Sequence, residues 1–301
     1  MRLAAVDVGS NTVQAVVADV STRGLREVAR HVEMPGLGAR VERTGSIGDE
    51  KMREALTALT SVLDRARQDG AEDLAIGATA AVRRASDGEA FCAGAGLRAG
   101  KPVHLLSEEV EARLAFLGVA SRHASAGRWL MADVGGASTE LVMAEGETVL
   151  DWLSLGLGSG VLADRLLSDP PHAGERRAVR GEAIRLLAAR PLAGAERLVA
   201  TGGTVLHLPA VIGTELEAGL GAADLARAAR RLDATASAEL GEQLRLPAAR
   251  VRALRAGVEI LSTLLDRAAL ERAELSREGL PHGMILALHR HGEDWHRITP
   301  G

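Results

Sequence analysis

The stretch Asp7-Val8-Gly9-Ser10-Asn11-Thr12 decides the fold, because it is a polar turn between two apolar runs. Leu3 to Val8 leads into the turn and Val13 to Asp19 follows it. Two such runs across a tight turn predict a β-hairpin. Glycine lets backbone N–H groups approach an anion, and successive N–H groups in a turn form an anion-binding concavity. The turn is therefore a candidate phosphate-binding loop, with binding residues Gly9, Ser10, Asn11 and Thr12.

A second copy of this arrangement is Asp133-Val134-Gly135-Gly136-Ala137-Ser138-Thr139. Strands are predicted on both sides of it, from Trp129 to Val134 and from Thr139 to Met143. One such turn alone is most simply a plain hairpin, but two copies about a domain apart favour a function. The candidate phosphate-binding residues here are Gly135, Gly136, Ser138 and Thr139.

An aspartate precedes each turn, Asp7 in the first copy and Asp133 in the second. A carboxylate repels phosphate, so neither aspartate is expected to bind the anion directly. Each is suited to hold Mg²⁺ or its waters, or to orient an attacking water molecule. Asp7 and Asp133 are therefore the candidate metal ligands, and Mg²⁺ is the expected cofactor.

The length of 301 residues predicts two domains, because a single hydrophobic core rarely grows to this size. The duplicated turns place the division within 121–127, which gives domains of residues 1–122 and 123–301. Each domain alternates predicted strands and helices, so the fold class is α/β. Helices are expected at 51–68, at 108–120 after a cap at Ser107, and at 251–270; the tail after His289 is expected to be polar and frayed.

Charge and cysteine content exclude some partners. The net charge of −4 provides no global basic field to recruit nucleic acid or an anionic membrane, so a polyanionic substrate needs a local positive site. The single Cys92 excludes an internal disulfide. The sequence has neither a signal-peptide pattern at its start nor an apolar run of membrane-spanning length. A cytoplasmic location is therefore expected.

Six segments in this order resemble the exopolyphosphatase/guanosine pentaphosphate phosphatase family. Two are the turns, in DVGSNTV and DVGGASTE, which resemble the two phosphate loops of the family. ATAAVRRA resembles its threonine-arginine segment, and LSEEVEARLAFLGV resembles the helix that carries its catalytic glutamate. ATGGT and SREGLPHGMI resemble signatures of its C-terminal domain. The resemblance spans nearly the whole chain.

This resemblance implies two ribonuclease-H-like domains of the actin-like ATPase superfold, with a cleft between them, Mg²⁺ dependence, and attack of water on a terminal phosphoryl group. Glu111 matches the catalytic glutamate, and a glutamate early in a helix is able to act as general base. Asp133 matches the aspartate that helps bind metal and orient water. Arg83 matches the family arginine, and a guanidinium suits bidentate phosphate contact. Ala115 and Gly118 share a helix face with Glu111 and are expected to leave room beside it.

Three functions from two classes remain open, beside a fourth, an actin-superfold kinase, which would need an acceptor-sugar site and an adenosine pocket that no segment of the sequence indicates. The first is an exopolyphosphatase that releases terminal phosphate from polyphosphate, and the second trims guanosine pentaphosphate. The third is a nucleotide or alarmone sensor with weak or no catalysis, suggested by two departures from the family pattern. Ala137 replaces the usual third glycine of the second loop, and residues 156–161 differ from the usual segment. The resemblance also suggests a homodimer, which no sequence feature indicates.

Overall fold

The computed structural model describes residues 1–22, 24–188 and 192–298. The chain divides into two compact units. The first unit combines Met1–Arg122 with the segment that starts at Glu278, and the second unit is His123–Arg277. The expected division gave residues 123–301 to the second domain, so the structure differs by returning the C-terminal segment to the first unit.

A five-stranded sheet forms the centre of the first unit, in the order β3-β2-β1-β4-β5. Neighbours β3, β2 and β1 are antiparallel, whereas β4 and β5 run parallel to β1. The predicted first hairpin is confirmed, because Val8 pairs with Val13 across the turn. The strands are β1 (Arg2–Val8), β2 (Val13–Ser21), β3 (Gly24–Glu33), β4 (Asp73–Ala78) and β5 (His104–Leu105).

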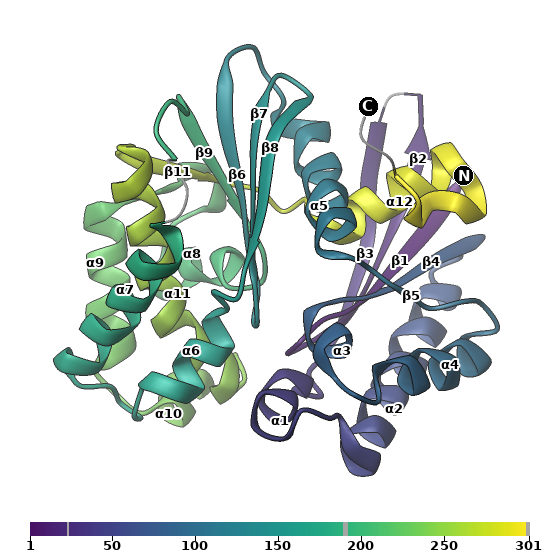
Figure 1. Ribbon diagram of the computed structural model, residues 1–301, viewed down its shortest axis with the longest axis horizontal. Helices are drawn as coiled ribbons and strands as arrows, with labels where there is room; N and C mark the ends of the chain where they lie inside the picture. The colour runs from purple at the N-terminus through teal and green to yellow at the C-terminus, as the bar shows by residue number, and fades with distance from the viewer. Residues whose placement is uncertain (23, 189–191, 299–301) are drawn as a thin grey trace. The chain divides into compact units, whose positions relative to one another are not determined.

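Helices pack against this sheet and close its core (Figure 1). Leu56, Leu59 and Leu63 of α2 are buried against alternate residues of β1, namely Ala4, Val6 and Val8. Because side chains alternate across a strand, Asp7 lies on the opposite face of the sheet. The helices of this unit are α1 (Leu37–Thr44), α2 (Gly48–Gln68), α3 (Ala80–Arg84), α4 (Gly88–Ala99), α5 (Glu108–His123), α12 (Leu280–His291) and the 3₁₀ helix η3 (Gly292–His296).

The C-terminal helix α12 belongs to the first unit because it packs against β1, β2 and β4. Two glycines allow it to approach α5 closely: a Cβ on Gly118 would lie 2.1 Å from the carbonyl oxygen of Gly279, and one on Gly283 would lie 1.7 Å from that of Leu114. The prediction that Gly118 leaves open space beside Glu111 is therefore wrong, because the backbone of α12 fills that space.

The tail beyond His289 is also more ordered than expected. The helix α12 continues to His291, and Trp295 in the following 3₁₀ helix is buried with 3% of its surface exposed. The ring of His296 stacks on His104, with 3.6 Å between centroids. The burial of Trp295 explains why this polar segment keeps its structure.

The second unit repeats the topology around a six-stranded sheet, in the order β10-β11-β9-β6-β7-β8. The neighbours β6, β7 and β8 are antiparallel, and β9 runs parallel to β6. The second predicted hairpin is confirmed, with Val134 paired to Thr139. The strands are β6 (Arg128–Val134), β7 (Thr139–Glu145), β8 (Thr148–Leu155), β9 (Arg197–Thr201), β10 (Leu220–Gly221) and β11 (Arg272–Leu275).

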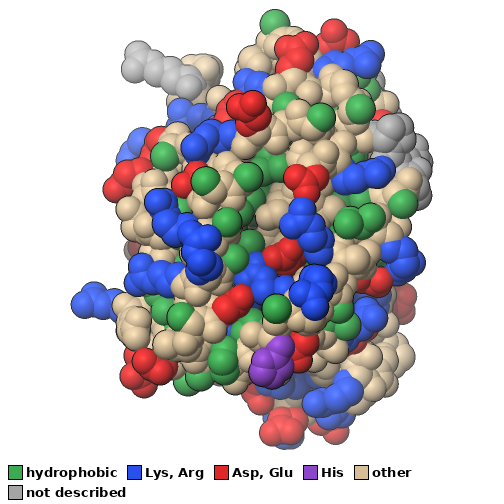
Figure 2. Space-filling model, turned by 90° about the vertical axis from the view of Figure 1, so that its left-hand side faces the viewer, with side chains coloured by type: hydrophobic (Ala, Val, Ile, Leu, Met, Phe, Trp, Pro, Cys, Tyr) green, Lys and Arg blue, Asp and Glu red, His purple; other side chains and the backbone are tan. Residues whose placement is uncertain are grey.

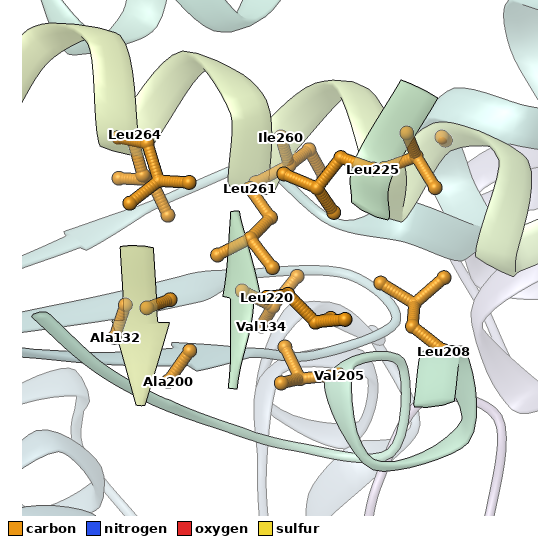
Figure 3. Close-up of a cluster of buried hydrophobic side chains, with 14 of the residues drawn as sticks. Ala132, Val134, Ala200, Val205, Leu208, Leu220, Leu225, Ile260, Leu261 and Leu264 are labelled. Carbon is orange, nitrogen blue, oxygen red and sulfur yellow. The ribbon is translucent and has the colours of Figure 1, made fainter. Parts of the chain in front are cut away.

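The core of the second unit lies between this sheet and the long helix α11 (Figure 3). Ala132 and Val134 of β6 face Leu261 and Leu264 of α11, so the intervening Asp133 lies on the other face of the sheet. The helices are α6 (Ser159–Leu166), α7 (Ala173–Leu187), η1 (Val205–His207), α8 (Leu208–Ile212), η2 (Leu216–Ala218), α9 (Ala222–Asp233), α10 (Ser237–Leu244) and α11 (Ala248–Ala268).

Charges of both signs cover the side of the second unit that carries α7 and α9 (Figure 2). Arg176 of α7 contacts Asp233 of α9 at 2.8 Å and also pairs with Glu259 of α11. Arg180 of α7 pairs with Asp266. These interspersed pairs cancel locally, so this surface presents no field of a single sign. No described helix is both long enough and apolar enough to cross a bilayer.

Candidate active site

The first turn closes with a hydrogen bond from the N–H of Gly9 to the carbonyl oxygen of Thr12, at 2.9 Å. The short helix α1 then docks on the turn. The N–H of Gly38 donates to the Ser10 carbonyl at 2.7 Å, and the N–H of Gly36 donates to the Asn11 carbonyl at 3.2 Å. A Cβ on Gly38 would lie only 3.0 Å from the Ser10 Cβ, so glycine permits this approach.

This docking orients the backbone of the turn for anion binding. In a trans peptide the C=O and the next N–H point in opposite directions. Because α1 holds the carbonyls of Ser10 and Asn11, the N–H groups of Asn11 and Thr12 point away from α1. Within the described ranges, neither N–H group has an acceptor. The side chains of Ser10, Asn11 and Thr12 make no hydrogen bond to described residues either, so the predicted loop offers several unused donors.

Asp7 ends β1 beside this turn and is 8% exposed. Its Oδ2 accepts a hydrogen bond from Gln14 Nε2 at 3.0 Å. Its Oδ1 is buried and has no partner in the described part of the chain. Burial raises the pKa of Asp7 to about 6, and the bond from Gln14 acts in the opposite direction. A buried carboxylate oxygen without a partner is costly unless a ligand satisfies it.

Glu111 and Arg83 lie together in the first unit. Glu111 is in the first turn of α5, which Ser107 caps through a hydrogen bond from the N–H of Val110. Arg83 Nη1 lies 2.8 Å from Glu111 Oε2 and donates to the carbonyl of Leu106 at 2.6 Å. The guanidinium that was predicted to bind phosphate thus holds the candidate base, while its Nη2 makes no hydrogen bond to described residues.

The second turn has the same construction, with α6 in the place of α1. The N–H of Gly135 donates to the Ser138 carbonyl at 3.0 Å. At the start of α6, the N–H of Ser159 donates to the Gly135 carbonyl, and those of Gly160 and Val161 donate to the Gly136 carbonyl. By the same peptide geometry, the N–H groups of Gly136 and Ala137 point away from α6.

The two departures from the family pattern have a structural explanation. Ala137 does not adopt a positive φ, since the positive-φ residues other than glycine in the described ranges are Arg245 and Ala269. Alanine at this position is therefore not strained. A Cβ on Gly158 would lie 2.2 Å from the Ala137 Cα, so the glycine in the altered segment allows α6 to reach the turn.

Thr139 occupies a different place from the one predicted. Its hydroxyl is fully buried and donates to the carbonyl of Leu157 at 2.5 Å. It therefore fixes the residue before Gly158 rather than facing an anion. The hydroxyl of Ser138 makes no hydrogen bond to described residues and keeps its predicted capacity as a donor.

Asp133 lies directly opposite Glu140 in the antiparallel pair β6–β7. Residues opposed in this way project from the same face of the sheet. Glu140 is 3% exposed and accepts a hydrogen bond from Ser154 at 2.9 Å. Glu140 is not among the site residues predicted from the sequence, although a glutamate directly after a small-residue turn, inside an otherwise apolar strand, is a usable signal.

The turn at Gly202-Gly203 lies beside Asp133 in the second unit. A Cβ on Gly202, whose φ is +96°, would lie 2.5 Å from Asp133 Oδ1. Ser159 is hydrogen-bonded to Thr204 at 2.7 Å. The ATGGT segment, which alone was a weak signal, thus contacts both the aspartate and the helix that supports the second turn.

Arg250, in the first turn of α11, is a cation that sequence analysis missed. Its Nη1 would lie 2.7 Å from a Cβ on Gly203. Burial lowers the pKa of Arg250, and its guanidinium has no hydrogen-bond or ion-pair partner among the described residues. A desolvated guanidinium without a counter-ion is suited to bind an anion. The sequence pattern around Arg250 predicts a helix, but it does not predict that Arg250 contacts Gly203.

The residues present fit a magnesium ion that substrate helps to hold. Within the described ranges, no group of three or more His, Cys, Asp or Glu side chains forms a metal site. Mg²⁺ commonly binds through one or two carboxylates, with substrate phosphates and waters completing its octahedron. In the first unit Asp7 suits such a role, because its buried Oδ1 has no partner among the described residues. In the second unit Asp133 and Glu140 are two carboxylates on one face of the sheet.

Comparison with known sequences gives the family. The profile of the Ppx/GppA phosphatase family matches residues 16–291. Exopolyphosphatase 2 of Mycobacterium tuberculosis is 34% identical over 226 residues, which cover 70% of each chain. The guanosine-5'-triphosphate,3'-diphosphate pyrophosphatase of Pseudoalteromonas translucida is 30% identical over 166 residues, which cover 55% of this chain and 33% of that relative.

Solved structures confirm the fold. A Cytophaga hutchinsonii exopolyphosphatase superposes with a TM-score of 0.86 over 100% of both chains, at 20% identity. The Ppx/GppA family member of Aquifex aeolicus gives 0.79 over 97% of this chain and 99% of its own, at 24% identity. The expected α/β fold with two ribonuclease-H-like domains of the actin-like ATPase superfold is therefore confirmed. The matched profile and the conserved architecture together show that this chain belongs to the Ppx/GppA phosphatase family.

Proposed function

We propose that this chain is an exopolyphosphatase that releases terminal phosphate from inorganic polyphosphate by Mg²⁺-assisted attack of water. One observation supports this most directly: each of two equivalent turns presents unused backbone N–H groups beside a strand-end aspartate. Such a turn recognises phosphate oxygens through the backbone and so requires no particular base or sugar. The mycobacterial exopolyphosphatase relative supports the same substrate.

In this proposal Glu111 is the general base that takes a proton from the attacking water. Arg83 holds Glu111 in place through the 2.8 Å ion pair, and its Nη2, which lies 4.0 Å from Glu108 Oε1, would contact a phosphoryl oxygen. In the first unit the residues of the turn would bind phosphate groups, and in the second unit the turn and Arg250 would do the same. In each unit the strand-end aspartate would be the metal ligand, Asp7 in the first and Asp133, opposite Glu140, in the second. A bound Mg²⁺ would supply positive charge against the charge that develops on the phosphoryl oxygens.

A second candidate substrate is guanosine pentaphosphate, which the Pseudoalteromonas relative favours. The catalytic residues are the same for both substrates, since both reactions break a terminal phosphoanhydride. The sensor alternative loses one of its supports, because Ala137 has an unstrained backbone conformation.

The test is release of phosphate from long-chain polyphosphate and from guanosine pentaphosphate by purified protein with Mg²⁺. The wild type is compared with Glu111→Gln and with the matched control Glu109→Gln. Glu109 is on the same helix, but it pairs with Arg113 rather than Arg83. The proposal is supported if the wild type and Glu109→Gln release phosphate and Glu111→Gln does not. The substrate that is hydrolysed faster decides between the two reactions. Nucleotide binding without turnover of either substrate would favour the sensor.

A further inference from the structure

Gln14 lies directly opposite Asp7 in the β1–β2 pair, so the two side chains project from the same face of the sheet. Gln14 Nε2 donates to Asp7 Oδ2 at 3.0 Å. This leaves Asp7 Oδ1 as the oxygen without a partner in the described ranges. The contact therefore determines which oxygen of the carboxylate remains for a ligand.

A second contact fixes the orientation of the Gln14 amide. Arg30 Nη1 lies 3.2 Å from Gln14 Oε1. A guanidinium has only donors, so the amide must turn its oxygen toward Arg30. Its nitrogen must then face Asp7, and a flip of the amide would break both hydrogen bonds. Arg30 is thus linked to Asp7 through the amide of Gln14.

Arg30 is itself held from the other side. Its Nη2 and Nε bind Glu27 at 2.7 and 3.1 Å, and Glu27 Oε2 lies 2.9 Å from Nε2 of the buried His282 on α12. Burial raises the pKa of Glu27, but hydrogen bonds from His282 and Arg30 outweigh it and lower that pKa to about 2. Glu27 is therefore ionised at neutral pH and anchors Arg30 continuously.

We propose that Gln14, oriented by Arg30, is the positioning residue that keeps Asp7 Oδ1 available as the oxygen that would bind Mg²⁺. The second unit provides the contrast, since Glu140 occupies the position across from Asp133. A glutamate accepts hydrogen bonds and does not donate them when ionised. The amide thus gives the first unit a donor to its aspartate where the second unit has another carboxylate. This inference rests on the proposed function for the role of Asp7.

The experiment measures Mn²⁺ binding by electron paramagnetic resonance, with Mg²⁺ competition, alongside phosphate release. The variants are Gln14→Met, which keeps the length but removes both polar groups, and Gln14→Leu, which also removes the amide and is shorter. Both are expected to weaken metal binding about 10- to 100-fold, the range typical of residues that orient a metal ligand. The control Gln68→Met, at an exposed position on α2, should leave binding unchanged.

A double-mutant cycle separates positioning from general damage. Arg30→Met should weaken Mn²⁺ binding in the wild type but have no further effect in Gln14→Met, because its action passes through Gln14. Additive losses, or unchanged binding in both Gln14 variants, would overturn the inference, and so would a wild type that binds no Mn²⁺. Metal binding that depends on Gln14 in a protein without phosphatase activity would support the positioning role while rejecting the proposed function.

Discussion

Arg83 Nη1 lies 2.8 Å from Glu111 Oε2, in a pair of which Glu111 is nearly fully buried. The pairing gives the guanidinium two roles: it compensates the charge of Glu111, and it fixes the carboxylate in one direction. A positioned base contributes about 10²- to 10⁴-fold to rate, so the distance between these two side chains is central to the proposed reaction.

Glu111→Gln should reduce kcat for polyphosphate by about 10²- to 10⁴-fold with little change in KM, because it removes the proton acceptor and keeps the shape. Arg83→Met should reduce kcat as well, since it leaves a buried carboxylate without its partner. Initial rates of phosphate release over a range of polyphosphate concentrations check both. A Glu111→Gln variant with wild-type kcat would exclude this residue as the base.

Gly158→Ala should disrupt the second turn, because the new Cβ would collide with the backbone of Ala137. Overpacking of this kind destabilises by about 1–3 kcal/mol, and the displaced amides should raise KM. The matched control is Gly181→Ala in α7, where the space around a Cβ is open. There alanine should stabilise by about 0.5–1 kcal/mol, since glycine is unfavourable within a helix. Thermal unfolding of both variants makes the comparison, and equal shifts in Tm would contradict the proposed contact.

Asp7 should make metal-free protein less stable as the pH rises. Burial raises its pKa from 3.8 to about 6, so the folded state binds the proton more tightly than the unfolded chain. The associated stability is fully present below about pH 4 and is lost as the pH rises through about 6. The loss is about 3 kcal/mol, from 1.4 kcal/mol for each unit of pKa.

Asp7→Asn should therefore unfold at higher denaturant concentration than the wild type at pH 7.5, and at a similar concentration near pH 4. Urea unfolding in chelator at the two pH values measures the difference. An Asp7→Asn variant that is less stable than the wild type at pH 7.5 would show that the ionised Asp7 does not destabilise the folded protein.

Arg255 should be essential for the stability of the second unit. It is completely buried, and its guanidinium donates to Asp169 and to the carbonyls of Leu232 and Thr235. Arg255→Met removes all three bonds, so unfolding should become easier by about 3–5 kcal/mol. Arg252→Met is the control, because Arg252 lies three residues before Arg255 on α11 but is more exposed. Its described contacts are a 3.4 Å hydrogen bond to the carbonyl of Leu167 and a 3.6 Å ion pair with Asp164. Urea midpoints that shift equally would refute the special role of Arg255.

Local sequence patterns alone predicted both hairpins and the main helices. The turn at 9–12 and the turn at 135–138 each lie between apolar runs, and hairpin pairing depends on neighbours along the chain. The same segments carry Asp7, Asp133 and the turn residues, so these candidates were visible from the sequence. The family resemblance added Glu111 and Arg83, which no periodicity distinguished from surface charges.

Only the tertiary structure decided how these residues are supported. The docking of α1 and α6 orients the turn amides, Gln14 selects one oxygen of Asp7, and Arg250 reaches Gly203 from a helix distant in sequence. The same holds for α12, whose glycines pack on α5 and place the end of the chain in the first unit. These contacts join segments far apart in the chain, and their geometry depends on packing in three dimensions, which a local pattern of residues does not encode.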